Sequence, residues 1–537
     1  MVDDTVQAGS GSDTGRSSGS GDVDMAHAGW GDPSRRTGLP RDTAAWLTSR
    51  VGSVRPSTPV PLTAVAVPAS RLSEADLAAL RATGADVLVD DAGRALRAAG
   101  RSYLDLLALR SGTFPAPDAV VLPGSAEQVG AVLRACAALG VAVVPFGGGT
   151  SVVGGVSPLA GAFSCVVSLD LRRLDQLLTW SEGDLTATFE PGLRGPAAET
   201  LLNARGLTLG HFPQSYEHAT IGGYAATRSA GQASTGYGRF DANVLGVTLQ
   251  TPSGELVLGR GAATAAGPGL LQLVIGSEGA FGVITSVTLR VRRLPAVKRY
   301  DAYLVRSWED GIAQLRRLEQ GGVVPDVVRL SDPSESTVNL RMGAPKAVQL
   351  LARGRCLLVL GWEGTAASVS DRRRASRIRG LRLPGAGVKW EHGRYQGPYL
   401  RDDLLDAGFL VETLETSATW SGLLTTYRAV QEAVSEALAE CVVMCHVSHL
   451  YSQGASLYFT VLAARSDAPV EQWQRAKNAA CAALVATGAT ITHHHGVGTD
   501  HRPWMTDEVG PLGVEVLRAV KAALDPGGVL NPGKLIP

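Results

Sequence analysis

The chain has 537 residues, and its 50 lysines and arginines balance 50 aspartates and glutamates, so its formal net charge is zero. This length allows two or three domains with separate hydrophobic cores, and the balanced charge argues against a general affinity for nucleic acid or an anionic bilayer. Six cysteines are too few for a disulfide framework in a chain of this size, which fits a reducing cytoplasm.

The N-terminal part of the chain changes character at about residue 25. Residues 1–24 are rich in glycine, serine and aspartate and almost free of large apolar groups, so we expect a disordered tail. No apolar segment led by lysine or arginine is present there, which argues against a secretory signal. Residues 25–116 form an N-terminal helical region, with helical apolar spacing at 72–84 and again at 93–112.

Short apolar runs alternate with helical segments across residues 117–295. The run 118–123 predicts a strand, and a helix follows with Ser125 as its N-cap and Gly140 at its end. Residues 141–149 then predict a strand that enters a glycine loop. We expect this whole region to form one α+β domain.

The remainder predicts a second α+β domain over residues 296–524. Long amphipathic segments at 420–440 and 469–488 predict helices, and the run 456–463 predicts a strand between them. The closing residues 525–537 are rich in turn-forming residues, and we expect them to pack back on the first domain.

Three glycine-rich loops in the first domain favour a long cofactor that carries a diphosphate. Gly147, Gly148 and Gly149 follow a predicted strand, where glycines let consecutive N–H groups point into one concavity. Their spacing fits neither the P-loop nor the Rossmann motif, and a tight turn between strands is the alternative. Residues 213–238 and 274–285 add two more loops of glycines and small hydroxyl residues.

Four motifs in order then make the chain recognisable. "PFGGGTSVVGG", "TIGGYAATRSAG", "GSEGAFGVIT" and "NPGK" resemble the vanillyl-alcohol oxidase / p-cresol methylhydroxylase superfamily of flavoproteins. The resemblance implies a two-part FAD-binding domain with an α+β cap domain over the flavin. Because neither of the first two motifs contains histidine or cysteine, it also implies non-covalent FAD. By resemblance, FAD is contacted by Pro145, Phe146, Gly147, Gly148, Gly149, Thr150, Ser151, Gln214, Ser215, Thr220, Gly222, Gly223, Thr227, Arg228, Ser229, Ala230, Gly276, Ser277, Glu278, Gly279 and Gly282.

Within this superfamily, one segment near the N-terminus and five segments of the expected cap resemble the alkylglycerone-phosphate synthases (alkyldihydroxyacetonephosphate synthases). The segments, in the synthase order, are "GWGDP", "VVRLSD", "PYLRDDLL", "LETSATW", "GASLYF" and "HHHGVG". These transferases exchange the acyl chain of acyl-dihydroxyacetone phosphate for a fatty alcohol through a covalent flavin N5 adduct, which yields an ether lipid precursor. The alternative is a D-lactate/glycolate-type dehydrogenase, which oxidises a 2-hydroxy acid by hydride transfer to FAD.

Three consecutive histidines, His493, His494 and His495, precede a Gly-x-Gly turn. In an extended segment the outer two face one way and the middle one the other, which is a poor ligand set, so we expect no metal. Cys441 to His449 likewise alternates like a strand and lacks the usual zinc spacing. The resemblance places the three histidines before the flavin, where they would orient substrate oxygens and move protons.

The resemblance also assigns catalytic and substrate-binding residues. Tyr458 lies on a predicted strand and would otherwise be interpreted as core, but it matches the general acid/base tyrosine of the family. A phenol needs a nearby positive charge to act as a base, and the histidines could supply it. Arg401 matches the arginine that binds the substrate phosphate, with a surface ion pair to a neighbouring aspartate as the alternative. Arg329 and His211 match two further residues of the site, in contact with substrate or near the cofactor.

The expected partners follow from the same resemblance: acyl-dihydroxyacetone phosphate, a fatty alcohol and a second copy of the chain in a homodimer. The uncharged stretch 135–169 is interrupted by Pro145, Pro158 and many glycines, which excludes a lipid-exposed span. We therefore expect no transmembrane segment, and a bacterial protein of the cytoplasm that contacts a membrane surface peripherally.

Overall fold

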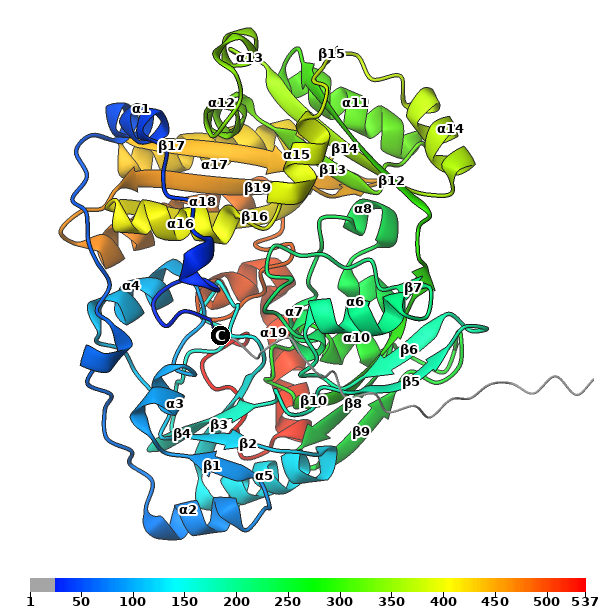
Figure 1. The fold of residues 1–537 in the computed structure, drawn as a ribbon. Coiled ribbons are helices and arrows are strands. Elements are labelled where there is room, and N and C mark those ends of the chain that lie inside the picture. The colour runs from blue at the N-terminus through cyan, green and yellow to red at the C-terminus, as the bar shows by residue number, and fades with distance from the viewer. Residues whose placement is uncertain (1–24) are drawn as a thin grey trace, which may run out of the picture.

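The computed structural model describes residues 25–537, and the tail expected at residues 1–24 lies outside them. Helices and strands alternate along the chain, so the predicted α+β class is confirmed. Two bodies of structure are visible in Figure 1, one above the other. The lower body, which we call the base, contains four- and five-stranded sheets, and the upper body, which we call the cap, is built on an eight-stranded sheet.

The base is formed by the first half of the chain. Its strands are β1 (Asp86–Leu88), β2 (Ala119–Leu122), β3 (Val141–Phe146), β4 (Cys165–Asp170), β5 (Leu177–Ser181), β6 (Thr186–Phe189), β7 (Leu207–Thr208), β8 (Val244–Thr251), β9 (Gly254–Leu258), β10 (Val283–Arg290) and β11 (Arg292–Arg293). The helices of this half of the chain are α1 (Arg41–Val51), α2 (Glu74–Arg81), α3 (Asp91–Ala95), α4 (Tyr103–Ser111), α5 (Ala126–Leu139), α6 (Gly195–Asn203), α7 (Ile221–Thr227), α8 (Ser234–Tyr237), α9 (Phe240–Asn243) and α10 (Leu270–Val274). Helix α1 packs on the cap instead.

The four-stranded sheet of the base has the order β1-β2-β4-β3, with β2, β4 and β3 parallel. These strands are apolar and buried, as expected for a parallel sheet with both faces covered. Helix α5 covers it and begins and ends as predicted, because the Ser125 side chain accepts the N–H of Gln128 and Gly140 adopts a left-handed conformation with φ of 65°. Strand β3 therefore delivers its glycine loop at the end of a rigid sheet.

The helical pattern over residues 93–112 is interrupted in the structure. Helix α3 ends near Ala95, and α4 begins only after Ser102. A capping box explains the new start: the Ser102 hydroxyl accepts the N–H of Asp105, and the Asp105 carboxylate accepts the N–H of Ser102. Apolar spacing alone did not reveal this break.

The cap follows as one antiparallel sheet with the order β15-β12-β14-β13-β17-β19-β16, and β18 pairs with β19. Its strands are β12 (Val297–Val305), β13 (Val327–Ser331), β14 (Cys356–Gly364), β15 (Leu381–Arg382), β16 (Phe409–Thr419), β17 (Cys441–Val447), β18 (Leu450–Tyr451) and β19 (Gly454–Ala464). Its helices are α11 (Trp308–Gln320), α12 (Pro333–Arg341), α13 (Lys346–Leu351), α14 (Ala366–Ser376), α15 (Ala386–Gly393), α16 (Gly397–Asp406), α17 (Leu423–Leu438) and α18 (Pro469–Ala486).

The two faces of the cap sheet have different partners because side chains alternate along each strand. On β19, Leu457, Phe459 and Val461 pack with α11, α17 and α18 in the main apolar core of the cap. The residues that alternate with them, Tyr458, Thr460 and Leu462, line a cavity on the opposite face. The sheet thus carries its functional side chains on the face turned away from this helical layer.

The last long helix, α19 (Met505–Leu524), contacts the base (Figure 1). The Lys521 ammonium donates to the carbonyl of Ala280, and the following residues pair with β3, where Asn531 N–H donates to the Val143 carbonyl at 2.8 Å. The range expected for the cap, up to residue 524, therefore includes a helix that packs on the base. Among residues 25–537, no helix has the length and apolar character needed to cross a membrane.

Candidate active site

A cavity of about 440 Å³ lies where the glycine loops of the base face the cap sheet. It brings together residues as far apart in the sequence as Trp30 and His495. The predicted site residues that line it are Pro145, Phe146, Gly147, Gly148, Gly149, Thr150, Ser151, Gln214, Ser215, Thr220, Gly222, Gly223, Thr227, Ser229, Ala230, Glu278, Gly279, Gly282, Arg329, Arg401, Tyr458, His494 and His495. The other five, His211, Arg228, Gly276, Ser277 and His493, lie behind this wall.

The first glycine loop presents bare backbone to the cavity. A Cβ on Gly148 would lie 2.1 Å from the carbonyl oxygen of His218, and one on Gly147 would lie 2.5 Å from Thr220 Oγ1, so only glycine fits at either position. Among the described residues, none of the N–H groups from Gly147 to Ser151 donates to a protein acceptor. A row of unpaired donors on a backbone wall fits the diphosphate of FAD.

Arg228, Gly276 and Ser277 support the loops from behind. The Arg228 guanidinium donates to the backbone carbonyls of Ile275 and Gln272, and it packs on Gly276, where a Cβ would lie 2.7 Å from Arg228 Nε. Ser277 is buried beside them. We predicted that these three residues contact FAD directly, but none of them lines the cavity. The side chain of Arg228 turns toward α10 instead.

Glu278 lines the cavity but uses its carboxylate to hold another segment. It accepts the N–H groups of Val497 at 2.6 Å and Gly498 at 2.8 Å, which belong to the turn after the three histidines. Burial raises the pKa of this carboxyl to about 7, and the two backbone donors oppose that shift. The third glycine loop therefore anchors the histidine segment to the base.

His211 is buried in the base and does not reach the cavity. Its Nε2 lies 3.1 Å from the hydroxyl of Ser229, and its ring packs edge-on against Tyr224 and Phe240. Burial lowers its pKa to about 3, so the ring is neutral at pH 7. Through this hydrogen bond His211 positions Ser229, which does line the cavity.

The three histidines are held by a residue that sequence reasoning did not assign a role. Glu415 on β16 accepts the backbone N–H groups of His493 at 2.6 Å, His494 at 3.1 Å and His495 at 2.9 Å. Although burial opposes the charged form, the neighbouring His494 and His495 hold the pKa of Glu415 well below its usual range. Glu415 stands in the quoted segment "LETSATW", but nothing in that pattern revealed its target.

This carboxylate bends the histidine segment, so the strand-like alternation expected for it is wrong. His494 and His495 both line the cavity, and His493 points behind them. Burial lowers the pKa of His495 to about 3 and that of His493 well below 6.5, so both are neutral at pH 7. The expected positive charge beside Tyr458 therefore does not come from these two rings.

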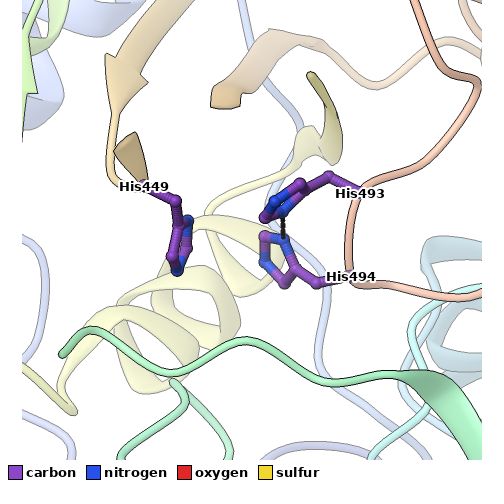
Figure 2. Close-up of side chains that lie close together, drawn as sticks. All are labelled: His449, His493 and His494. Carbon is purple, nitrogen blue, oxygen red and sulfur yellow. Dashed lines mark hydrogen bonds between the residues drawn. The ribbon is translucent and has the colours of Figure 1, made fainter. Parts of the chain in front are cut away.

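A fourth histidine, His449, approaches the segment from the cap, as Figure 2 shows. The ligand atoms of His449, His493 and His494 lie within 4.8 Å of one another. However, His449 Nε2 lies 3.0 Å from the Gly231 carbonyl, and His493 uses Nε2 for Tyr451 and Nδ1 for His494. A metal ion would have to displace these hydrogen bonds, so the expectation of no metal stays our prediction.

Tyr458 stands among aromatic and charged neighbours on the cap sheet. Its ring stacks on His446 with 4.8 Å between centroids and meets His495 edge-on at 5.4 Å. Burial raises the pKa of its phenol, and the positive charges of Arg401 and Arg329 oppose that shift. At pH 7 the phenol is protonated, and these two arginines favour its ionised form.

Arg329 is fixed by a carboxylate that the sequence did not single out. Glu335 Oε1 accepts from Arg329 Nη2 at 2.6 Å and lies 3.0 Å from His446 Nδ1. Burial opposes ionisation of Glu335, but Arg329 and His446 lower its pKa to about 2. The carboxylate thus orients the imidazole on which Tyr458 stacks.

Arg401 on α16 has two buried donors that no protein group accepts among the described residues. Its Nη1 donates to the Arg101 carbonyl at 2.8 Å, whereas Nε and Nη2 are buried with no partner among the described residues. The alternative of an ion pair with the next two aspartates is not seen, because Asp402 accepts the Trp30 N–H and Asp403 pairs with Arg36. Two buried, unpaired N–H donors on a charged group fit an anionic ligand.

Beyond Arg401 the cavity continues into an apolar arm between α1, α12, α16 and the cap sheet. Apart from Met342, the residues that line it belong to one apolar cluster of the cap. The arm is lined by Leu39, Leu47, Val338, Met342, Leu404 and Met444. Sequence reasoning gave no location for such an arm, because its residues come from the loop before α1, from α1, from α12 and its C-cap, and from α16 and β17.

Comparison with known proteins agrees with this arrangement. Residues 117–259 match the family described as "FAD binding domain", and residues 294–535 match "FAD linked oxidases, C-terminal domain". The alkyldihydroxyacetonephosphate synthase of Trypanosoma brucei brucei is 32% identical over 472 residues, which cover 82% of this chain and 76% of that protein. The chain belongs to the alkyldihydroxyacetonephosphate synthase family.

Two other relatives also match most of the chain. The synthase of Dictyostelium discoideum is 31% identical and covers 84% of this chain and 79% of its own length. A mitochondrial D-lactate dehydrogenase (cytochrome) of Arabidopsis thaliana is 27% identical, with 78% of this chain and 74% of that protein covered. FAD is the cofactor of the matched domains, and the unpaired N–H groups of the first glycine loop fit it.

Solved structures confirm the fold. An alkyldihydroxyacetonephosphate synthase superposes with a TM-score of 0.81 at 25% identity, covering 95% of this chain and 99% of that one. A p-cresol methylhydroxylase with bound substrate gives 0.66 at 15% identity, covering 87% and 98%, and it supports the fold alone. The two-part FAD-binding domain with an α+β cap, expected from the sequence, is confirmed.

Proposed function

We propose that this protein exchanges the acyl chain of acyl-dihydroxyacetone phosphate for a fatty alcohol and so forms an ether lipid precursor. The observation that carries the proposal is a single cavity with three kinds of wall. It joins the unpaired guanidinium of Arg401, the Tyr458 and histidine cluster, and an apolar arm. In a substrate with a phosphate at one end and a long hydrocarbon chain at the other, the phosphate suits Arg401 and the chain suits the apolar arm. The carbonyl group between them then lies beside Tyr458 and the histidines.

In this proposal Arg401 binds the phosphate of the substrate. The free Nε and Nη2 donors of its planar guanidinium can contact two phosphate oxygens together. Arg329 is already paired with Glu335 and serves instead as a fixed positive charge near Tyr458. The acyl chain, and afterwards the alkyl chain, would occupy the apolar arm and bury hydrocarbon there.

Tyr458 is proposed as the general acid/base. Its phenol is protonated at rest, and Arg401 and Arg329 favour the phenolate that would take a proton from the carbon next to the substrate carbonyl. His494 and His495, held by Glu415, would orient the substrate oxygens and the incoming alcohol. FAD, when bound, supplies an electrophilic ring system that assists the exchange of one chain for the other.

The test uses purified, FAD-loaded protein under nitrogen with palmitoyl-dihydroxyacetone phosphate and hexadecanol. We expect the alkyl ether by mass spectrometry, together with free palmitate and no requirement for an electron acceptor. Tyr458→Phe should abolish the ether and retain FAD. Absence of both ether and palmitate, combined with flavin bleaching by a 2-hydroxy acid, would instead support the dehydrogenase alternative.

We also propose that FAD is held without a covalent bond and that the chain acts as a homodimer at a membrane surface. No cysteine lines the cavity among the described residues, and the motifs "PFGGGTSVVGG" and "TIGGYAATRSAG" contain neither histidine nor cysteine that could form such a bond. Acid precipitation should therefore release all flavin into the supernatant. Light scattering and flotation with phospholipid vesicles test the dimer and the membrane contact.

A further inference from the structure

A second cavity, of about 510 Å³, lies on the other side of the histidine segment. It is lined by Tyr451 and by the surface residues Gln453, Asp507 and Glu508, which are exposed, so it opens to solvent. The active-site cavity, in contrast, is lined by His494. His493 lines neither of the two and stands in the wall between them.

Two hydrogen bonds cross this wall. His494 Nδ1 lies 2.8 Å from His493 Nδ1, and His493 Nε2 lies 2.5 Å from the Tyr451 hydroxyl. Both are inside the range in which a proton can pass directly between heavy atoms. Figure 2 shows the first link, with the two imidazoles facing each other through their nitrogens. Together the three side chains form an unbroken path from one cavity to the other.

We propose that Tyr451, His493 and His494 conduct a proton between the active site and the outer cavity. The proposal deepens the proposed function and rests on it. In that reaction the alcohol loses its O–H proton as its oxygen bonds to the substrate carbon, while the fatty acid leaves as a carboxylate with the electron pair of the broken C–O bond. One proton per turnover must therefore leave a cavity whose apolar arm would be occupied by the hydrocarbon chains.

The path can move this proton without leaving a charge on His493. His494 gains the proton at the ring nitrogen that faces the cavity and passes its Nδ1 proton to His493. His493 passes its Nε2 proton to the Tyr451 oxygen, and the hydroxyl proton goes to water in the outer cavity. Burial holds the pKa of His493 well below 6.5, so a relay through neutral tautomers suits this ring better than a lasting imidazolium ion.

The surroundings favour this direction. Asp507 and Glu508 line the outer cavity, and their carboxylates place negative charge at the end of the path. Arg239 donates to the His493 carbonyl at 3.0 Å and helps to keep this segment in place. Glu415 fixes the backbone of His493 and His494, so the two rings keep their contact during turnover.

The first measurement does not depend on catalysis. In FAD-loaded protein labelled with ¹⁵N-histidine, nuclear magnetic resonance reports the ring protons of ten histidines and their exchange with water. We expect the ring proton of His493 to exchange about tenfold more slowly, or to change tautomer, in Tyr451→Phe. An unchanged tautomer and exchange rate would overturn the path, whatever reaction the enzyme performs.

The second measurement follows turnover with the acyl and alcohol substrates. Tyr451→Phe should lower kcat by about tenfold or more with KM unchanged, and it should increase the solvent deuterium isotope effect. In Tyr451→Ala the missing ring leaves room beside His493, so added imidazole should restore much of the lost rate. Imidazole should not restore Tyr451→Phe, because its ring still fills that space.

The matched control is Tyr103→Phe, which removes a buried hydroxyl that has no hydrogen-bond partner among the described residues. It should keep wild-type turnover and isotope effect. Wild-type kcat in Tyr451→Phe, or a rate loss in Tyr451→Ala that imidazole leaves unchanged, would overturn the relay. If the wild type forms no ether, the proposed function fails, and the magnetic resonance result alone then decides the relay.

Discussion

Replacement of Arg401 by methionine tests the phosphate site most directly. The side chain has two buried donors, Nε and Nη2, without a partner among residues 25–537, and we assign both to phosphate oxygens. A hydrogen bond to a charged group contributes about 1.5–3 kcal/mol. Loss of two such bonds should therefore cost about 3 kcal/mol or more, which corresponds to about a hundredfold loss in kcat/KM.

The assay compares two substrates that differ only in the phosphate. Wild-type enzyme should prefer palmitoyl-dihydroxyacetone phosphate over palmitoyl-dihydroxyacetone, and Arg401→Met should lose most of that preference. Arg401→Lys keeps the charge but not the planar pair of donors, so it should recover only part of it. If Arg401→Met loses the same factor with both substrates, Arg401 acts through structure and the phosphate assignment is refuted. Thermal unfolding of both variants checks that FAD and fold are retained.

Three further predictions concern the cofactor wall, the histidine anchor and the apolar arm. Gly148→Ala should abolish FAD retention after gel filtration, because its Cβ would lie 2.1 Å from the His218 carbonyl oxygen. Glu415→Gln should flatten the acid side of the Tm-versus-pH curve. The folded-state pKa of Glu415 is depressed, so its contribution to the stability of the wild type is complete above the unfolded pKa of about 4.3. This stability is lost as pH falls through the folded pKa. Equal slopes of Tm against pH on the acid side for variant and wild type would contradict this. Met342→Trp should shorten the arm and shift the preferred alcohol to shorter chains in a competition between dodecanol and hexadecanol.

The sequence predicted those parts of the molecule in which local pattern determines structure. Helix α5 begins after Ser125 and ends at Gly140 as expected, because capping depends on neighbours in the sequence. The glycine loops were also predicted from local sequence. A positive φ, or a close approach of the backbone to another group, favours glycine wherever it occurs. The cap strand that carries Tyr458 was also predicted from its apolar residues.

The parts that escaped prediction depend on contacts between distant segments. The bend of the histidine run is imposed by Glu415, which lies 78 positions before His493 in the sequence. Arg228 lies within the motif "TIGGYAATRSAG", and the motif gives no sign that this side chain differs from its neighbours. In the structure it donates to the Gln272 carbonyl of α10 and does not line the cavity. Arg401 has two aspartates beside it, and only the tertiary partners of those aspartates show that its own donors stay free.

The segment from His493 to Gly498 is hydrogen-bonded to two carboxylates, one in the cap and one in the base. Glu415 of the cap binds its first three N–H groups, and Glu278 of the base binds the N–H groups of Val497 and Gly498. One continuous piece of backbone is therefore hydrogen-bonded to the cap at its start and to the base at its end. A chimera that exchanges the cap between relatives must therefore keep residues 493–498 together with both glutamates. Without these hydrogen bonds, the exchanged cap would be displaced relative to the FAD site of the base.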